Sequence, residues 1–329
     1  MLKRLAIFSD GTWSKPSQDF PTNVVKLSRA ILPVDGSGIE QRVFYHDGVG
    51  ASGGWWRHFT GGAFGEGIDG IIKANYRFLI ENYESGDELF LFGFSRGAYL
   101  ARSTAGLIRN CGLLKPAHLD QFDAAYDLYR RRDEASHPRA DEATAFRAAY
   151  SWEPRIKFIG VWDTVGSLGI PITPLRFWTK EFYEFHDVQL SSWVDSAFQA
   201  LAVDERRKPF APTLWQGQAN AKDQILEQAW FPGVHSNIGG GYGDHSLSDL
   251  ALQWLADKAQ ASGLALTLPV GMAANALGAM QDSMTFWYRL LGEYLRAINS
   301  GADGQFITAR FKERQQGTTD YRPPNVPWP

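Results

Sequence analysis

The stretch that decides the fold is "ELFLFGFSRGAYLAR", Glu88–Arg102. The apolar run Glu88–Phe92 leads into the pentapeptide "GFSRG", and a segment with the composition of a helix follows. This order predicts a buried strand, a sharp turn and a helix, the setting of a nucleophile elbow around Ser95. The two glycines are required there because a Cβ at either place would clash with neighbouring chain. The competing interpretation is a glycine-rich turn in which Ser95 only caps the helix.

Apolar runs of the same kind recur along the chain, as expected for parallel strands that are buried on both faces of a sheet. Segments with helical spacing of apolar residues separate them, so the chain alternates strand and helix. This alternation predicts an α/β fold with a doubly wound, mostly parallel sheet like that of the α/β-hydrolases. The other predicted strands are Arg4–Phe8, Arg42–Tyr45, Lys157–Trp162 and Gln228–Phe231, and the predicted helices include Asn23–Leu32, Gly67–Tyr83 and Ala98–Ile108.

We expect residues 1–329 to form a single catalytic domain. Insertions near 115–154 and 166–194 interrupt the alternation; the first has helical character, the second is rich in aromatic residues, and both are expected to cap the catalytic rim. A helix is expected from Asp249 to about Ser262, followed by a helical extension over 264–329 with one or two helices in Met272–Ile298. The proline-rich tail "YRPPNVPWP" is expected to be extended.

The turns that follow the predicted strands carry the residues able to do chemistry. Ligands bind at the carboxyl ends of the strands in such sheets, and one rim would gather Ser95, Asp163 and His235. A serine needs a base at neutral pH, and His235 follows Ser95 and Asp163 in the chain order Ser, Asp, His of the α/β-hydrolases. His245 and His46 are the alternative bases.

The carboxylate that orients the base is expected to be Asp163, which ends the strand that follows the nucleophile strand. Asp204 and Asp244 are the alternatives. In "LAVDERR" we expect Asp204 to form a structural ion pair with Arg206 or Arg207 instead.

Backbone amides are expected to stabilise the oxyanion: the N–H of Arg96, and that of Gly11 or Thr12 in "FSDGTW", with Asp10 bracing this loop. Asp10 also suggests a competing function, a metal-dependent phosphohydrolase in which this aspartate is the nucleophile. A second alternative is a non-catalytic protein of hydrolase fold whose aromatic surface binds a lipid or a partner.

The glycine-rich segment Gly50–Gly67 contains the adjacent residues Trp55 and Trp56. It lacks the Gly-Lys-Ser/Thr ending of a phosphate-binding loop. We interpret it as a loop near the rim whose tryptophans either contact an acyl chain or a lipid surface or pack in the ordinary way.

Composition narrows the function classes. The chain of 329 residues carries a formal net charge of −3, which argues against a nucleic-acid partner. Its one cysteine, Cys111, excludes an intrachain disulfide or a multi-cysteine zinc site, and no metal or organic cofactor is expected. No signal peptide or run long enough to span a membrane is visible, so we expect synthesis in the cytoplasm.

Six blocks of the sequence together resemble a known family. They are "IFSDGTW", "YHDGVG", "GDELFLFGFSRGAYLAR", "GVWDTVGSLG", "ALAVDERR" and "WFPGVHSNIGGGY". In this order they are similar to the DUF2235 family, which includes the Tle1-like phospholipase effectors of type VI secretion. The resemblance implies an α/β-hydrolase fold and, as in the effector members, phospholipase A-like hydrolysis of acyl esters. Peripheral membrane contact and delivery by type VI secretion are further expectations. It implies Ser95 as nucleophile, His235 as base and Asp163 as acid.

Overall fold

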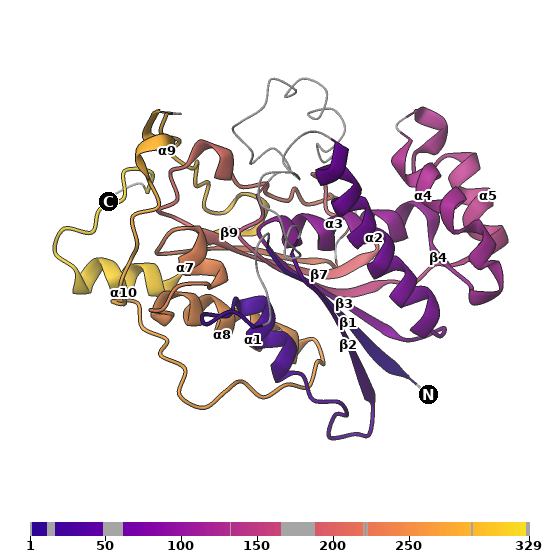
Figure 1. Ribbon diagram of the computed structural model, residues 1–329, viewed down its shortest axis with the longest axis horizontal. Helices are drawn as coiled ribbons and strands as arrows, with labels where there is room; N and C mark the ends of the chain where they lie inside the picture. The colour runs from indigo at the N-terminus through magenta and orange to yellow at the C-terminus, as the bar shows by residue number, and fades with distance from the viewer. Residues whose placement is uncertain are drawn as a thin grey trace.

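The computed structural model describes residues 2–11, 17–48, 62–131, 133–165, 188–219, 221, 223–290 and 292–326. In these residues, parallel strands form one sheet in the order β2-β1-β3-β6-β7-β8-β9 (Figure 1). The predicted α/β fold with a doubly wound parallel sheet is confirmed. The strands are β1 Lys3–Ser9, β2 Glu40–His46, β3 Glu88–Phe94, β6 Ile156–Trp162, β7 Val194–Ala202, β8 Ile225–Phe231 and β9 Gln305–Ile307.

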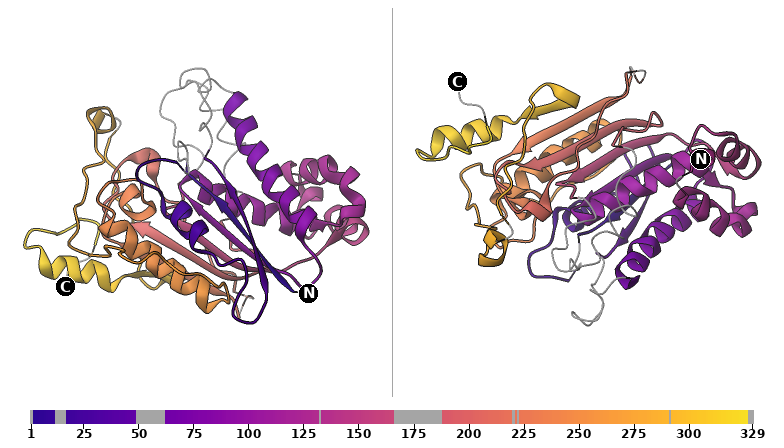
Figure 2. Two further views of the ribbon diagram at one scale, coloured as in Figure 1. Left: turned by 60° about the horizontal axis from the view of Figure 1, so that its bottom comes forward. Right: turned by 90° about the horizontal axis from the view of Figure 1, so that it is seen from above.

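Helices cover both faces of the sheet, because alternate residues of each strand point to opposite sides. In β1, Leu5 and Ile7 join a core cluster with the helices α2 and α3, whereas Ala6 and Phe8 join a second cluster with α1 and α8. Figure 2 shows these two helical layers on either side of the strands. The helices are α1 Asn23–Ala30, α2 Gly62–Asn82, α3 Arg96–Cys111, α7 His235–Gly239 and α8 Ser246–Ala261.

The insertion over 115–154 is helical, as predicted, with α4 Phe122–Arg130 and α5 Asp141–Tyr150. It is bounded by the short antiparallel pair β4 Leu113–Leu114 and β5 Ser151–Trp152. Because α3 runs back along the sheet from β3 and β6 begins just after β5, α4 and α5 lie near the amino ends of the strands (Figure 1). The prediction that this insertion caps the rim of Ser95 is therefore wrong. In the second insertion, residues 166–187 lie outside the described residues.

One or two helices are predicted in Met272–Ile298. Among its described residues, 272–290 and 292–298, the short α9 Phe286–Leu290 is the one helix that forms. Outside α9, backbone N–H groups of this segment donate hydrogen bonds to distant parts of the chain. The N–H of Ala279 donates to Asp244 Oδ2, and that of Tyr294 donates to the carbonyl of Arg206. These contacts hold the segment in a non-helical path.

The sequence interpretation also missed two strands of the main sheet, β7 and β9. In β7, the polar residues Ser196 and Gln199 interrupt the apolar run by which a buried strand is recognised in sequence, although both are buried in the sheet. The short β9 extends the sheet beside β8, and α10 Ala309–Gly317 follows it at the same end of the molecule (Figure 1). The tail from Thr318 to Val326 is not helical, as expected, and Tyr321 and Val326 join a third core cluster with Trp230. In the part of the chain that the structure covers, no helix is long and apolar enough to cross a membrane.

Candidate active site

The register of the strands brings their carboxyl ends to one edge. Ser9 lies opposite Gly93, Phe94 opposite Trp162, and Ala202 opposite Phe231. Ser95, Asp163 and His235 follow β3, β6 and β8 directly or within four residues, so the topology collects them at this edge. The chain also reverses direction across the sheet here, because β2 lies on one side of β1 and β3 on the other. Such a switch point is the usual place for a ligand site.

The turn at Ser95 has the geometry that its sequence predicts. Ser95 adopts φ 59° and ψ −119°, a strained conformation for a residue with a Cβ. A Cβ on Gly93 would lie 2.2 Å from the carbonyl oxygen of Gly97, and one on Gly97 would lie 2.0 Å from that of Ser9. Ser95 precedes α3 but makes no side-chain capping hydrogen bond. Ser95 thus occupies the N-cap position without a side-chain cap, which argues against a role limited to capping the helix.

Gly97→Ala is expected to lower the free energy of unfolding by about 3 kcal/mol or more, because the added methyl overlaps the backbone of β1. Gly70→Ala is the matched control: it lies in α2 with no atom within 4 Å of the added Cβ. A gain of about 0.5–1 kcal/mol is expected there. Urea unfolding of both variants measures the difference, and equal stability of the two would contradict the tight turn.

Three side chains form a hydrogen-bonded series at the edge. Ser95 Oγ lies 2.8 Å from His235 Nε2, and His235 Nδ1 lies 2.5 Å from Asp163 Oδ2. A carboxylate can only accept, so His235 Nδ1–H donates to Asp163 and Nε2 accepts from the serine hydroxyl. This is the tautomer that a general base requires. All three residues are buried, with exposed fractions of 7% for Ser95, 4% for His235 and 0% for Asp163.

Apolar rings surround the imidazole. The Phe94 ring lies 4.6 Å and the Phe210 ring 4.9 Å from the His235 ring, measured between centroids. Burial lowers the pKa of His235 below its ordinary value of 6.5, although the neighbouring Asp163 opposes the shift. The ring is therefore neutral at pH 7 and able to accept a proton.

Asp163 is held by more donors than His235 alone. Its backbone has φ 40°, a second strained position at this edge. Asp163 Oδ1 accepts from the N–H of Ala202 at 2.9 Å and from Arg296 Nη1 at 2.6 Å, and Oδ2 accepts from Arg296 Nη2 at 2.9 Å. Burial alone would raise the pKa of Asp163, but Arg296 and His235 hold it well below its ordinary value.

Arg296 is the residue that sequence reasoning missed. It lies in the segment expected to be helical, where an arginine is normally an exposed cation, yet its side chain is fully buried. No spacing or motif in the sequence connects it to Asp163, which is 133 positions away. Only the folded path of the segment that follows α9 brings the two together.

The alternative acids have other partners. Asp204 Oδ2 accepts from the N–H of Gly233 and from the hydroxyl of Tyr321, and Asp244 accepts from the N–H groups of Ser246 and Ala279. The ion pair predicted for Asp204 is wrong. The neighbouring Glu205 pairs with Arg207 at 2.7 Å, and Arg206 pairs with Glu293 at 2.6 Å.

The alternative bases are also engaged away from Ser95. His245 Nδ1 lies 2.6 Å from Asp249 Oδ2, and His46 Nδ1 lies 2.7 Å from the carbonyl oxygen of Asp47. Of the three candidate histidines, His235 is the one that contacts Ser95.

The loop after β1 lies against the serine, as expected for an oxyanion loop. A Cβ on Gly11 would be 3.5 Å from Ser95 Cβ. The Gly11 N–H, however, donates to Asp10 Oδ1 at 2.6 Å, which argues against Gly11 as the oxyanion donor. Thr12, Trp55 and Trp56 lie outside the described residues.

Asp10 braces this loop, as predicted. Its carboxylate accepts from the N–H of Gly11 and from the hydroxyls of Thr22 at 2.7 Å and Tyr45 at 2.8 Å. Asp10 is 1% exposed, so its oxygens are turned toward these donors rather than toward the rim. This arrangement argues against the nucleophilic role considered for Asp10.

Comparison with known proteins gives one family, one relative in sequence and several similar solved structures. Residues 3–258 match the family model for the catalytic domain of the type VI secretion phospholipase effector Tle1-like proteins. The uncharacterized protein YEL023C of Saccharomyces cerevisiae is 29% identical over 228 residues, covering 63% of this chain and 32% of its own length. This chain thus spans about a third of that relative.

Two solved structures are similar to this chain. A crystal structure of an uncharacterized protein from Pseudomonas aeruginosa superposes with a TM-score of 0.49 at 19% identity, covering 82% of this chain and 47% of the other. The Tle1 effector bound to the VgrG spike of the type VI secretion system superposes with a TM-score of 0.43 at 18% identity, covering 74% and 52%. The match over residues 3–258 accounts for most of the sequence, and the chain therefore belongs to the family of type VI secretion Tle1-like phospholipase effector catalytic domains.

Proposed function

We propose that this chain is a serine esterase of the lipase type, which hydrolyses carboxylic esters through an acyl-enzyme on Ser95. The observation that carries the proposal is the hydrogen-bonded series from Ser95 Oγ through His235 to Asp163, at 2.8 Å and 2.5 Å. A nucleophile, a base in the required tautomer and an orienting carboxylate are the minimum set for acyl transfer. Membership of a phospholipase effector family supports the same chemistry.

In the first half-reaction, Ser95 Oγ attacks the ester carbonyl while His235 Nε2 takes the hydroxyl proton. Charge that develops on the carbonyl oxygen is stabilised by the N–H of Arg96, the first residue of α3, with Thr12 as the expected second donor. The imidazolium formed on His235 is stabilised by Asp163. Collapse of the tetrahedral intermediate breaks the bond to the leaving alcohol, which takes the proton from His235.

In the second half-reaction, water replaces the alcohol. His235 Nε2 takes a proton from the water as its oxygen attacks the acyl carbonyl on Ser95. The tetrahedral intermediate then releases the carboxylic acid and returns the proton to Ser95 Oγ. Every proton moves between Ser95, His235, the substrate and water, so the proposed cycle needs no metal or organic cofactor.

We further propose acyl esters of phospholipids as the substrate class, with a phospholipase A-like cut, peripheral membrane contact and delivery by type VI secretion. Membership of a type VI secretion phospholipase effector family supports the substrate class and the delivery route. The apolar rings of Phe94 and Phe210 beside the base suit an apolar acyl group. A non-catalytic role is disfavoured by the strained turn at Ser95, because such strain persists where it serves a function.

Covalent labelling by a fluorophosphonate tests the proposed mechanism. The purified protein is expected to form one adduct, which peptide mapping by mass spectrometry assigns to Ser95. Heat-unfolded protein serves as the control and is expected to stay unlabelled, because activation requires the assembled base. The absence of an adduct on native protein, or an adduct at another serine, would contradict the assignment of Ser95 as nucleophile. Hydrolysis assays on a panel of phospholipids and soluble esters then test the substrate class.

The pH dependence of the reaction follows from the environment of His235. Its pKa is lowered by burial, and the base must be neutral to act. We therefore expect kcat/KM for a soluble ester to be constant near pH 7 and to fall tenfold per pH unit only below an apparent pKa under 6.5. An acid limb centred above 6.5 would contradict the buried environment of the base.

A further inference from the structure

The carboxylate of Asp163 is clamped by a guanidinium group that uses all four of its terminal N–H donors. Arg296 Nη1 and Nη2 donate to Asp163 Oδ1 and Oδ2 at 2.6 Å and 2.9 Å. The same two nitrogens donate to the carbonyl oxygens of Ala202 at 2.9 Å and Phe210 at 2.7 Å. A planar fork held on all these sides fixes the plane of the carboxylate that it binds.

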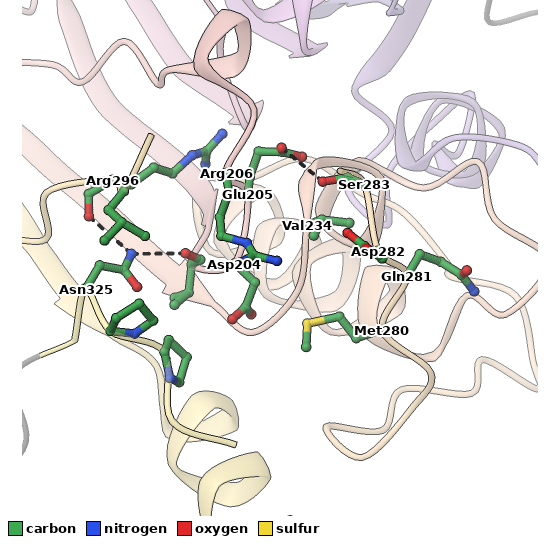
Figure 3. Close-up of a pocket in the computed structure, with 14 residues that line it drawn as sticks. Asp204, Glu205, Arg206, Val234, Met280, Gln281, Asp282, Ser283, Arg296 and Asn325 are labelled. Carbon is green, nitrogen blue, oxygen red and sulfur yellow. Dashed lines mark hydrogen bonds between the residues drawn. The ribbon is translucent and has the colours of Figure 1, made fainter. Parts of the chain in front are cut away.

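The backbone of Arg296 is fixed as well. Asn325 Nδ2 donates to the carbonyl oxygens of Arg296 and Val203, both at 3.1 Å. Figure 3 shows Asn325 beside Arg296 at a cavity of about 250 Å³, with Glu205 and Ser283 joined by a hydrogen bond elsewhere on its lining. The tail thus ties Arg296 to the loop that follows β7.

Two carboxylates lie beside the catalytic base, and each is paired with a guanidinium group that cancels its charge. On one side, Asp163 accepts from His235 Nδ1 and is neutralised by Arg296. On the other, Glu205 Oε2 accepts from the backbone N–H of His235 at 3.2 Å and is neutralised by Arg207. These charged groups surround a ring that also contacts the neutral Ser95. A cation paired with each carboxylate reduces the negative potential that would otherwise favour the imidazolium.

From this geometry we propose that Arg296 is a positioning residue of the active site: it holds Asp163 in the orientation that accepts from His235 and moderates the basicity of that histidine. The proposal rests on the proposed function and deepens it. Arg296 lies beyond residues 3–258, which match the family model. Arg296 therefore links the chain that follows these residues to the acid of the active site.

The test compares Arg296→Met with Arg314→Met. Arg314 is the matched control because it is also buried in the C-terminal segment and donates to carbonyl oxygens, those of Ala276 and Gly278, at 2.7 Å and 2.9 Å. In Arg296→Met we expect kcat to fall at least about 10²-fold with KM within about threefold. The acid limb of kcat/KM is expected to move up by about one pH unit, since the cation no longer opposes protonation of His235.

In Arg314→Met, kcat/KM is expected to stay within about threefold of the wild type, with an unmoved acid limb, even where urea unfolding shows a lower stability. The proposal is overturned if Arg296→Met loses no more kcat than Arg314→Met, or if its acid limb does not move. Arg296→Lys serves if the methionine variant does not fold. It keeps the charge but not the fork, so an acid limb like that of the wild type and about a tenfold loss of kcat are expected.

A wild-type kcat in Arg296→Lys would also overturn the proposal. Fluorophosphonate labelling of the wild-type protein distinguishes failure of the role proposed for Arg296 from failure of the proposed function. If Ser95 is labelled and the Arg296 variants behave like the control, only the role of Arg296 fails. If Ser95 is not labelled, the proposed function itself fails.

Discussion

Ser95→Ala is expected to lower kcat/KM for ester hydrolysis by at least about 10⁴-fold, because the acyl-enzyme cannot form without the hydroxyl. Ser95 Oγ is the group that His235 Nε2 contacts at 2.8 Å, and the substitution removes it while keeping the Cβ that the turn already accommodates. The fold should therefore persist, with unfolding by urea close to that of the wild type. Steady-state kinetics on a soluble ester measures the loss.

Ser262→Ala is a matched control for this experiment. Its hydroxyl donates to the carbonyl of Lys258 at the end of α8, so activity is expected within about twofold of the wild type. Near-full activity in Ser95→Ala would end the assignment of the nucleophile. Loss of activity with loss of folding in both serine variants would point instead to general fragility of the protein.

Asp163→Asn is expected to reduce kcat by about 10³- to 10⁴-fold and also to destabilise the protein. The amide no longer fixes the tautomer of His235, which accounts for the kinetic loss. It also leaves the buried Arg296 guanidinium without its counter-charge, which costs about 3–5 kcal/mol. Kinetics and urea unfolding of the same preparation measure the two effects.

The contribution of the Asp163–Arg296 ion pair to the free energy of unfolding depends on pH. The folded protein holds the pKa of Asp163 well below its ordinary value of 3.8, with burial opposing and Arg296 causing the shift. Stability from the pair is thus fully present above pH 3.8 and is lost as the pH falls further, since the unfolded chain then binds the proton first. The asparagine variant should lack this dependence.

Asp195→Asn provides the comparison on the surface. Asp195 pairs with Arg155 at 2.6 Å, but both side chains are partly exposed, so a loss below about 1 kcal/mol is expected. If Asp163→Asn proved as mild as Asp195→Asn in both stability and kcat, the buried pair would have neither the structural nor the orienting role assigned to it.

Much of the site could be predicted because it follows local patterns. The strand, turn and helix around Ser95 are adjacent in sequence, and parallel strands place whatever follows them at one edge. The same argument predicts Asp163 and His235 at this edge, and His235 contacts both Ser95 and Asp163 there. The position of Asp10 after the first strand predicts a brace, and its carboxylate accepts from Thr22 and Tyr45.

The rest depends on contacts that no local pattern encodes. β7 escaped prediction because Ser196 and Gln199 are polar in sequence but buried in the sheet, where Gln199 Nε2 donates to the carbonyl of Thr213. The apolar spacing over Met272–Ile298 indicated helix, yet distant partners such as Asp244 satisfy its backbone. Arg296 lies in that segment. Because the sequence indicates a helix there, it gives no sign that Arg296 pairs with Asp163.

The clamp on Asp163 has a consequence for synthesis of the chain. Ser95 and His235 are separated by 140 positions, and Asp163 and Arg296 by 133. Closing such long loops is slow, and a ribosome releases these residues in order from Ser95 to Arg296. A nascent chain that has exposed Ser95, Asp163 and His235 still lacks the guanidinium that holds Asp163. Under the proposed function, full activity is therefore acquired only after Arg296 has emerged and the segment around it has folded.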